Sequence, residues 1–278
     1  MKVTVVVDNA VPIGMRHPFL AEHGLSLLIE HAGKKLLLDA GQSSAAVSNL
    51  SLLGVQASAL DLLAISHGHY DHTGGLFHVL QHARKQIPVY AHQRVFDAHY
   101  SVARGERRFI GIPHAKPLLT ALGADWRLAD QPMEILPRLW MSGQIPRTTD
   151  YETGDAHLVT CGADGSDCKD EIADDSSLFY AGPRGLVVIG GCTHAGLVNT
   201  VQWGLKVTGA SRLAAWIGGT HLGPLAKEQQ EKTLAQLVSF GPDLVAANHC
   251  TGFAMMAQLH ERFGKKFIPA FVSTVMEV

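Results

Sequence analysis

Apolar positions along the chain follow two alternating patterns, short β-branched runs and longer segments with helical spacing. In the first half the short runs predict strands that end in turn residues. These strands are expected at residues 3–7, 25–30, 34–41, 62–66 and 88–91. Helical spacing predicts helices over residues 43–54, 74–87 and 93–100. The first of these stops at Gly54, as expected for a helix with a glycine after its C-terminus.

The second half repeats this alternation, and each of its predicted strands leads to a histidine. Strands are predicted at residues 185–191, 212–219 and 243–252, and helices at residues 197–209 and 227–241. His194, His221 and His249 stand at or just past the C-terminal ends of the three strands. Together with the end of the strand at residues 62–66, four strand ends therefore deliver histidines.

The region between the halves, residues 115–180, is less regular. It holds paired strand-like segments at residues 132–137 and 139–145 and a polar insertion near 161–175. Apolar strands follow closely on both sides, so we interpret the insertion as a loop or flap rather than a linker. The whole pattern predicts one α/β domain over residues 1–278, with sheets packed face to face and helices outside.

Composition narrows the class of protein. With 278 residues and 46% hydrophobic content the chain can bury a large core. A net charge of −2 gives no electrostatic reason to expect nucleic acid as a partner. No apolar stretch is long enough for a membrane span, so we expect a cytoplasmic protein without a membrane partner. The basic stretch at residues 104–108 is interpreted as solvated surface, with contact to an anionic substrate as the alternative.

The stretch "SHGHYDHTGG" at residues 66–75 concentrates ligand-type side chains at one strand end. His67 and His69 are two apart, so in extended backbone they point the same way and can share one metal ion. A turn after them lets Asp71 and His72 face a second ion. Burying four such groups without a metal would leave several polar atoms without partners. We therefore predict two divalent ions, Zn²⁺ in the first place, with Mn²⁺ or Fe as alternatives.

"HGHYDH" followed by "TGG" resembles the H-x-H-x-D-H signature of the metallo-β-lactamase fold. The resemblance implies a four-layer αββα sandwich, of α/β (α+β) class, with a binuclear site along one sheet edge. Asp39 in "LLLDAG" fits the upstream acid that orients the ligands in this family. The stretches "DAGQS", "SGQIPR", "GGCTHAGLVNTV", "IGGTHL" and "HCTGF" are also similar to the subfamily named after the archaeal 7,8-dihydropterin-6-methyl-4-(β-D-ribofuranosyl)aminobenzene 5′-phosphate synthase, many of whose members are uncharacterised metal-dependent hydrolases. This similarity runs from Asp39 through Gly252.

The resemblance implies a set of ligands, residue by residue. The motif itself supplies the first four, and His249 in "NHCTG" matches the last histidine, on the second ion. The implied metal ligands are His67, His69, Asp71, His72, His194 and His249. The superfamily places a bridging aspartate after the middle histidine, but none follows "VVIGG" here. Cys192 stands in that place, and a thiolate is an alternative ligand for zinc.

Three further positions carry open alternatives. His221 is a candidate ligand, a candidate catalytic general acid or substrate contact, or a residue that orients a ligand. Arg147 in "GQIPR" is predicted either to grip an anionic substrate group or to form a structural ion pair. Gln144 stands where relatives tend to carry Glu, so no role that needs a carboxylate is assigned to it. The remaining histidines are interpreted as ordinary hydrogen-bonded residues, namely His17, His23, His31, His78, His82, His92, His99, His114, His157 and His260.

The predicted function is that of a metal-dependent hydrolase acting on a small molecule. Two close divalent ions lower the pKa of bound water toward about 7, which permits hydrolysis of a phosphoester, lactone or thioester at neutral pH. Asp71 would align the attacking water and His221 would protonate the leaving group. The alternatives are a synthase that joins a pterin diphosphate to an arylamine ribosyl phosphate, and a non-catalytic metal-binding protein. The oligomeric state is left open.

Overall fold

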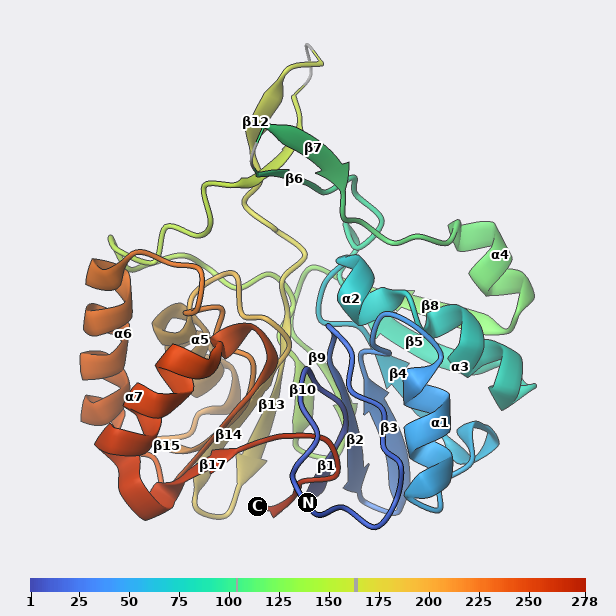
Figure 1. Ribbon diagram of the computed structural model, residues 1–278, viewed down its shortest axis with the longest axis horizontal. Coiled ribbons are helices and arrows are strands. Elements are labelled where there is room, and N and C mark those ends of the chain that lie inside the picture. Colours follow the sequence, from blue (N-terminus) through green and yellow to red (C-terminus); the bar gives the residue numbers. More distant parts are fainter. Residues whose placement is uncertain (104, 163–164) are drawn as a thin grey trace.

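Two seven-stranded sheets pack face to face, and helices cover both outer faces (Figure 1). The computed structural model describes residues 1–103, 105–162 and 165–278. The arrangement confirms the predicted four-layer αββα sandwich. None of the helices in the described residues is both long enough and apolar enough to span a membrane.

The first sheet comes mainly from the N-terminal half. Its strands are β1 (Lys2–Val7), β2 (Ser26–His31), β3 (Lys34–Leu38), β4 (Leu62–Ala64), β5 (Ile87–Ala91), β8 (Ala124–Leu128) and β18 (Val275–Glu277). They lie in the order β18-β1-β2-β3-β4-β5-β8, and β3, β4, β5 and β8 run parallel. The outer face packs against helices of the same half, which are α1 (Ala45–Leu52), α2 (Tyr70–Thr73), α3 (Leu76–Ala83) and α4 (Lys116–Ala121).

The second sheet holds most of the C-terminal half. Its strands are β9 (Met133–Leu136), β10 (Leu139–Met141), β13 (Ser177–Gly182), β14 (Gly185–Gly190), β15 (Leu213–Gly218), β16 (Leu244–Ala247) and β17 (Phe267–Pro269). They lie in the order β17-β16-β15-β14-β13-β10-β9, with β14 to β17 parallel. Three helices cover its outer face, α5 (Leu197–Thr208), α6 (Lys227–Phe240) and α7 (Phe253–Phe263). Single 3₁₀ turns are η1 (Ala57–Ala59), η2 (His249–Thr251) and η3 (Gly264–Lys266).

Side chains along the strands alternate between the core that lies between the two sheets and the helices outside. Leu27, Leu36, Leu178, Ile189 and Ile217 are fully buried between the two sheets. Neighbouring positions of the same strands point outward, under the helices. Because parallel strands of both sheets end at the same edge, the loops that follow them meet there, where α/β sheets commonly bind ligands.

A small third sheet rises above that edge (Figure 1). It consists of β6 (Tyr100–Ala103), β7 (Glu106–Phe109), β11 (Leu158–Cys161) and β12 (Asp167–Lys169), in the order β12-β11-β6-β7. We call it the upper sheet. Ile110, Leu158 and Ile172 form a small apolar cluster at its base, and Tyr70 of the histidine motif packs against it.

The upper sheet corrects two expectations. The helix predicted over residues 93–100 is wrong, because these residues form turns and lead into β6. Val95 alone among their side chains is buried in the apolar core, so no helical stripe exists to pack. The insertion near 161–175 is more than a loop, since part of it forms β12 and pairs with β11. Arg104 of the basic stretch and two residues of the insertion, Ala163 and Asp164, lie outside the described residues.

Candidate metal centre

Four strand ends bring the predicted ligands together. The motif follows β4, and its extended backbone changes to helix α2 at Tyr70. His194 follows β14, His221 follows β15, and His249 opens the turn after β16. All six predicted metal ligands are buried. His221 and His249 adopt left-handed backbone (φ 48° and 50°), a conformation that is uncommon outside glycine and often found at functional sites.

The first group of donors consists of three imidazoles. His67 Nε2 lies 3.0 Å from His69 Nδ1 and 3.2 Å from His194 Nε2. Burial lowers the pKa of all three rings, that of His69 to about 3, so they are neutral at pH 7. Tetrahedral zinc with nitrogen ligands at about 2.0–2.1 Å sets those nitrogens roughly 3.3 Å apart. The nitrogens of His69 and His194 both lie at nearly that distance from His67 Nε2, as neutral ligands of one ion would.

The second group combines a carboxylate with two imidazoles. His249 Nε2 lies 3.2 Å from His72 Nε2 and 3.3 Å from Asp71 Oδ2. Burial opposes ionisation of Asp71, yet His72 and His249 hold the pKa of its carboxyl well below the usual range. Burial also opposes a charge on His72, but Asp39 and Asp71 raise its pKa to about 9. A cation at this group would take the place of the His72 proton.

Hydrogen bonds fix which ring nitrogen faces the centre. The hydroxyl of Ser66 donates to Asp39 Oδ2 (2.7 Å), so its oxygen accepts from His67 Nδ1 (2.9 Å). Asp39 Oδ2 also accepts from His72 Nδ1 (2.7 Å). The side-chain oxygen of Asn9 accepts from His249 Nδ1 (3.0 Å). In each ring Nε2 is therefore left to face the other donors, which is the tautomer that metal ligation needs.

Cys192 lies between the two groups. Its Sγ is 3.2 Å from His72 Nε2 and within 4.8 Å of the facing nitrogen of His249. The same sulfur lies within 4.8 Å of the ligand atoms of His67 and His194. Burial raises the pKa of its thiol, so ligation by sulfur requires a cation to displace the proton. The geometry suits the alternative of a thiolate ligand shared by both groups.

His221 lies beside the first group, with its ring centroid 4.1 Å from that of His194. Its Nε2 is 3.7 Å from Asp155 Oδ2. Burial opposes protonation, but Asp155 raises the pKa of His221 to about 9. A protonated ring next to the donors can give up a proton, and this suits the general-acid alternative. Asp155 carries no sequence signal that would have marked it.

The first and second sheets meet very closely beneath the donors. Asp39 Oδ1 accepts the Ser66 backbone N–H (2.7 Å), so the end of β3 is tied to the end of β4. Gly191, after β14, sits directly against this pair. A Cβ at Gly191 would lie 2.1 Å from Ser66 Oγ and 3.2 Å from Asp39 Oδ2. Only glycine permits this approach of the two sheets.

Two carboxylates that no sequence pattern marked hold the backbone at the predicted C-terminal ligands. Asp8 Oδ1 accepts the His249 backbone N–H (2.8 Å). Asp175 Oδ2 accepts the N–H of Ala195 (2.9 Å), the residue that follows His194. Both acids are buried, and burial raises their pKa values, that of Asp175 to about 7. Asp8 follows the first strand, and Asp175 belongs to the insertion.

Two histidines interpreted as ordinary lie at the centre. The ring of His99 is 5.2 Å from that of His69, and its Nδ1 bonds Asp170 Oδ2 (2.6 Å). Burial opposes its charge, but Asp170 and Asp174 raise the pKa of His99 to about 10. His23 Nε2 lies 3.3 Å from the carboxylate of Asp71. Both reach the centre from segments outside the motif, and spacing in the sequence gives no sign of this.

The acidic end of the insertion also supports the motif. Asp174 Oδ2 accepts the backbone N–H of Gly68 (2.7 Å), between the first two motif histidines. Its other oxygen lies 3.5 Å from His99 Nε2. The insertion was interpreted as a loop or flap, and three of its acids, Asp170, Asp174 and Asp175, are buried. Several acidic residues close together in an insertion are a sequence signal from which supports of the motif could have been proposed.

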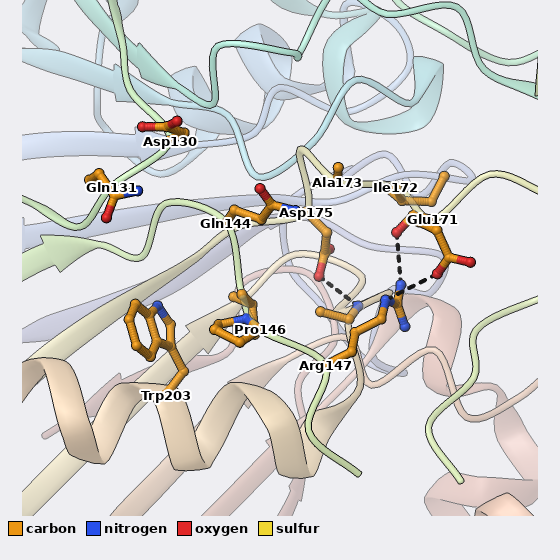
Figure 2. Close-up of a pocket in the computed structure, with 12 residues that line it drawn as sticks. Asp130, Gln131, Gln144, Pro146, Arg147, Glu171, Ile172, Ala173, Asp175 and Trp203 are labelled. Atoms are coloured by element: carbon orange, nitrogen blue, oxygen red, sulfur yellow. Dashed lines mark hydrogen bonds and ion pairs between the residues drawn. The ribbon is translucent and has the colours of Figure 1, made fainter. Parts of the chain in front are cut away.

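Arg147 and Gln144 line a neighbouring pocket of about 510 Å³. Figure 2 shows this pocket, with Arg147 linked to Glu171 on its wall. Arg147 donates to the backbone carbonyls of Glu171 (2.8 Å) and Glu152 (3.2 Å). Its Nε lies 3.4 Å from the Glu171 carboxylate. These contacts are those expected if Arg147 forms a structural ion pair. A role of Arg147 in substrate binding stays a prediction.

A smaller pocket of about 140 Å³ opens onto the donors themselves. We call it the histidine pocket. Its walls combine donors of both groups with residues of the upper sheet and its base. The lining residues are His23, His69, Tyr70, Asp71, Ser101, Arg108, Ile110, Leu158, Cys192, His194, His221, His249 and Cys250. Arg108 belongs to the basic stretch that was interpreted as solvated surface.

Comparisons with known proteins agree with this geometry. The sequence model of the metallo-beta-lactamase superfamily matches residues 21–146. The chain is 30% identical, over 91% of its length and 89% of the relative, to 7,8-dihydropterin-6-methyl-4-(beta-D-ribofuranosyl)-aminobenzene-5'-phosphate synthase of Methanocaldococcus jannaschii. An uncharacterised protein of the same archaeon is 31% identical over 93% of the chain and 94% of the relative.

Solved structures give the same result. The crystal structure of a metal-dependent hydrolase of the beta-lactamase superfamily superposes with a TM-score of 0.84 at 25% identity, covering 100% of this chain and 99% of that one. A diphosphatase of the PhnP family superposes with a TM-score of 0.56 at 12% identity, covering 100% and 97% of the two chains. The second likeness concerns the fold alone.

Proposed function

This chain belongs to the metallo-beta-lactamase superfamily, and from that premise we propose that it is a metal-dependent hydrolase of a small-molecule phosphoester, lactone or thioester. One observation carries the proposal. Two groups of converging donors, His67–His69–His194 and Asp71–His72–His249, lie side by side with Cys192 between them. Such a pair suits two divalent ions, Zn²⁺ in the first place, with Mn²⁺ or Fe as alternatives.

Divalent ions at such a centre make water acidic enough to attack at neutral pH and stabilise negative charge on oxygen. The residues of the chain contribute the rest. Asp71, ionised and 3.3 Å from His23, can orient a water by accepting a hydrogen bond from it. His221, whose pKa Asp155 raises, can protonate the leaving group. Burial of the donors keeps bulk water away and strengthens these interactions.

Turnover of bis(p-nitrophenyl) phosphate and of a simple lactone, with Zn²⁺ or Mn²⁺ supplied, tests the proposal. We expect metal-dependent hydrolysis of at least one substrate class. The His221→Gln variant separates the general acid from the metal ligands. Its kcat should fall about 10²- to 10⁴-fold for esters with alkoxide leaving groups and little for nitrophenyl esters, whose leaving group needs no proton. Equal losses on both would remove the acid role from His221.

A synthase is the second candidate function, favoured by the 30% identity over 91% of the chain to a protein of that name. In this case a pterin diphosphate and an arylamine ribosyl phosphate would be joined with loss of the diphosphate. Incubation of the metal-loaded protein with both compounds, followed by mass spectrometry of the product, tests it. A joined product would replace hydrolysis as the main activity.

The third candidate is a non-catalytic metal-binding protein. Stoichiometric metal without turnover on either set of substrates would favour it. In all three cases we propose a small-molecule partner, cytoplasmic location and no nucleic-acid partner, since the net charge of −2 supplies no basic surface for phosphate backbones.

A further inference from the structure

Arg108, on β7 of the upper sheet, faces the histidine pocket. We propose that its guanidinium binds an oxyanion of the substrate, a phosphoryl or carboxyl group, and so selects anionic substrates for the centre. The inference rests on the proposed function, because it concerns the substrate of the same site. It assigns to Arg108 the role that the sequence suggested for Arg147.

The position of Arg108 is fixed by the fold of the motif. The backbone N–H of Tyr70 donates to the carbonyl of Ile110 (2.9 Å), and the N–H of Ile110 donates to the carbonyl of His99 (2.9 Å). Arg108 is two residues from Ile110. The side chains of Tyr70, Ile110, Leu158 and Ile172 pack together at the same place. The end of β7 is thus anchored to the backbone between the ligands His69 and Asp71.

Alternation along β7 separates Arg108 from Arg107, because successive side chains of a strand point to opposite faces. Arg107 lies 3.5 Å over the ring of Tyr100, and its Nε donates to Asp167 (2.9 Å). Its charge is therefore already paired on the outer face. Arg108 lies on the other face, with its guanidinium 5.1 Å from the centre of the Tyr70 ring.

The charge of Arg108 is available to a ligand. No carboxylate of the described residues forms an ion pair with it, although five other arginines in this part of the chain each pair with one. Contact with the Tyr70 ring restricts its side chain and reduces the entropy lost on binding. Its planar fork matches the geometry of phosphoryl and carboxyl oxygens.

The experiment compares Arg108→Gln with the matched control Arg107→Gln, both loaded with Zn²⁺. Calorimetry measures binding of phenylphosphonate, benzoate and neutral benzamide, none of which is a substrate for hydrolysis. We expect Arg108→Gln to weaken binding of at least one of the two anions by about tenfold or more, with benzamide unchanged. Loss for phenylphosphonate identifies a phosphoryl group, and loss for benzoate alone identifies a carboxyl group. Arg107→Gln should match the wild type.

Equal anion binding by Arg108→Gln and the wild type would overturn the proposal, and so would equal losses in both variants. The metal content of each variant is measured beside the titration, because a drop there would point to damage at the centre. Binding needs no turnover, so a protein that hydrolyses nothing can still support or overturn the role of Arg108. Failure of the hydrolase proposal and failure of this one are therefore separate results.

Discussion

The two halves of the molecule supply the predicted ligands in different ways. The N-terminal half delivers four from a single stretch, residues 67–72, and orients the rings of His67 and His72 through their Nδ1 atoms by way of Ser66 and Asp39. The C-terminal half delivers His194 and His249 from separate strand ends. There, carboxylates bind the backbone next to each ligand, Asp175 at Ala195 and Asp8 at His249.

This difference separates two physical tasks. Bonds to ring nitrogens decide the tautomer and the basicity of a ligand, so their loss acts directly on metal affinity. Bonds to the backbone decide where a loop sits, so their loss acts first on local stability. Substitutions of residues that orient the ligand rings, such as Asp39, should therefore change metal binding more than folding, and those at Asp8 or Asp175 should do the reverse.

Removing donors from the contiguous stretch should have the largest effect. The double variant His67→Ala, His69→Ala takes two of the three rings from the first group. We expect it to lose one of the two proposed ions and to lower kcat by about a thousandfold or more. Metal analysis and turnover measure this. The control is His78→Ala, His82→Ala, a pair on α3 away from the donors. Unchanged turnover in the first variant would defeat the hydrolase mechanism.

The Asp39→Asn variant tests orientation through the ring. The carboxylate accepts the Ser66 backbone N–H on one oxygen and the Ser66 hydroxyl and His72 on the other, and an amide has only one acceptor oxygen, so we expect about ten- to hundredfold weaker metal binding. Competition with a chelator gives the affinity. Asp61→Asn, on the surface beside Lys34, is the control. Affinity equal to that of the wild type would show that Asp39 does not orient ligands.

The Cys192→Ser variant tests the residue that lies between the two groups. A hydroxyl is a harder donor than a thiolate, so Zn²⁺ affinity should fall about tenfold while Mn²⁺ affinity changes little. Parallel titrations with both ions measure the difference. Cys168→Ser, on the exposed strand β12, is the control. A uniform loss for both ions would point to packing rather than ligation by sulfur.

The Asp8→Ala variant tests support through the backbone and should change metal affinity least. It leaves the N–H groups of His249 and Ala10 without their acceptor. The free energy of unfolding should fall by about 1–3 kcal/mol, and metal affinity by less than in Asp39→Asn. Urea unfolding measures the first quantity. Asp8→Asn keeps an acceptor oxygen and should recover most of the stability. A loss of metal affinity larger than that in Asp39→Asn would contradict the distinction between support through the ring and support through the backbone.

The structure brings together the predicted ligands that are close in the chain or stand at a strand end. Residues 67–72 form one turn, and His194, His221 and His249 follow buried strands whose period is clear. The layers could also be predicted, since strands and helices alternate. Asp8, His23 and His99 were not identified as site residues from the sequence, because the residues that they contact at the centre lie far away in the chain. A single histidine or aspartate has no spacing from which to infer its partner.

The upper sheet was missed for a related reason. Its four short strands carry mostly exposed residues, so they lack the apolar alternation that marks a strand. Residues 93–100 show helical spacing, but Val95 alone among them is buried in the apolar core, so the spacing was misleading there. Arg107 and Arg108 look equivalent in the sequence, and only pairing of β7 with β6 places one outside and the other above the pocket.

Gly191 has a consequence for the spacing of the centre. A methyl group there would press on Ser66 and Asp39 and act as a wedge between β14 and the motif. Cys192 and His194, which follow directly, would then move away from the donors of the N-terminal half. The gap between the two donor groups, and with it any preference for larger or smaller ions, can be tuned from a position that belongs to neither group.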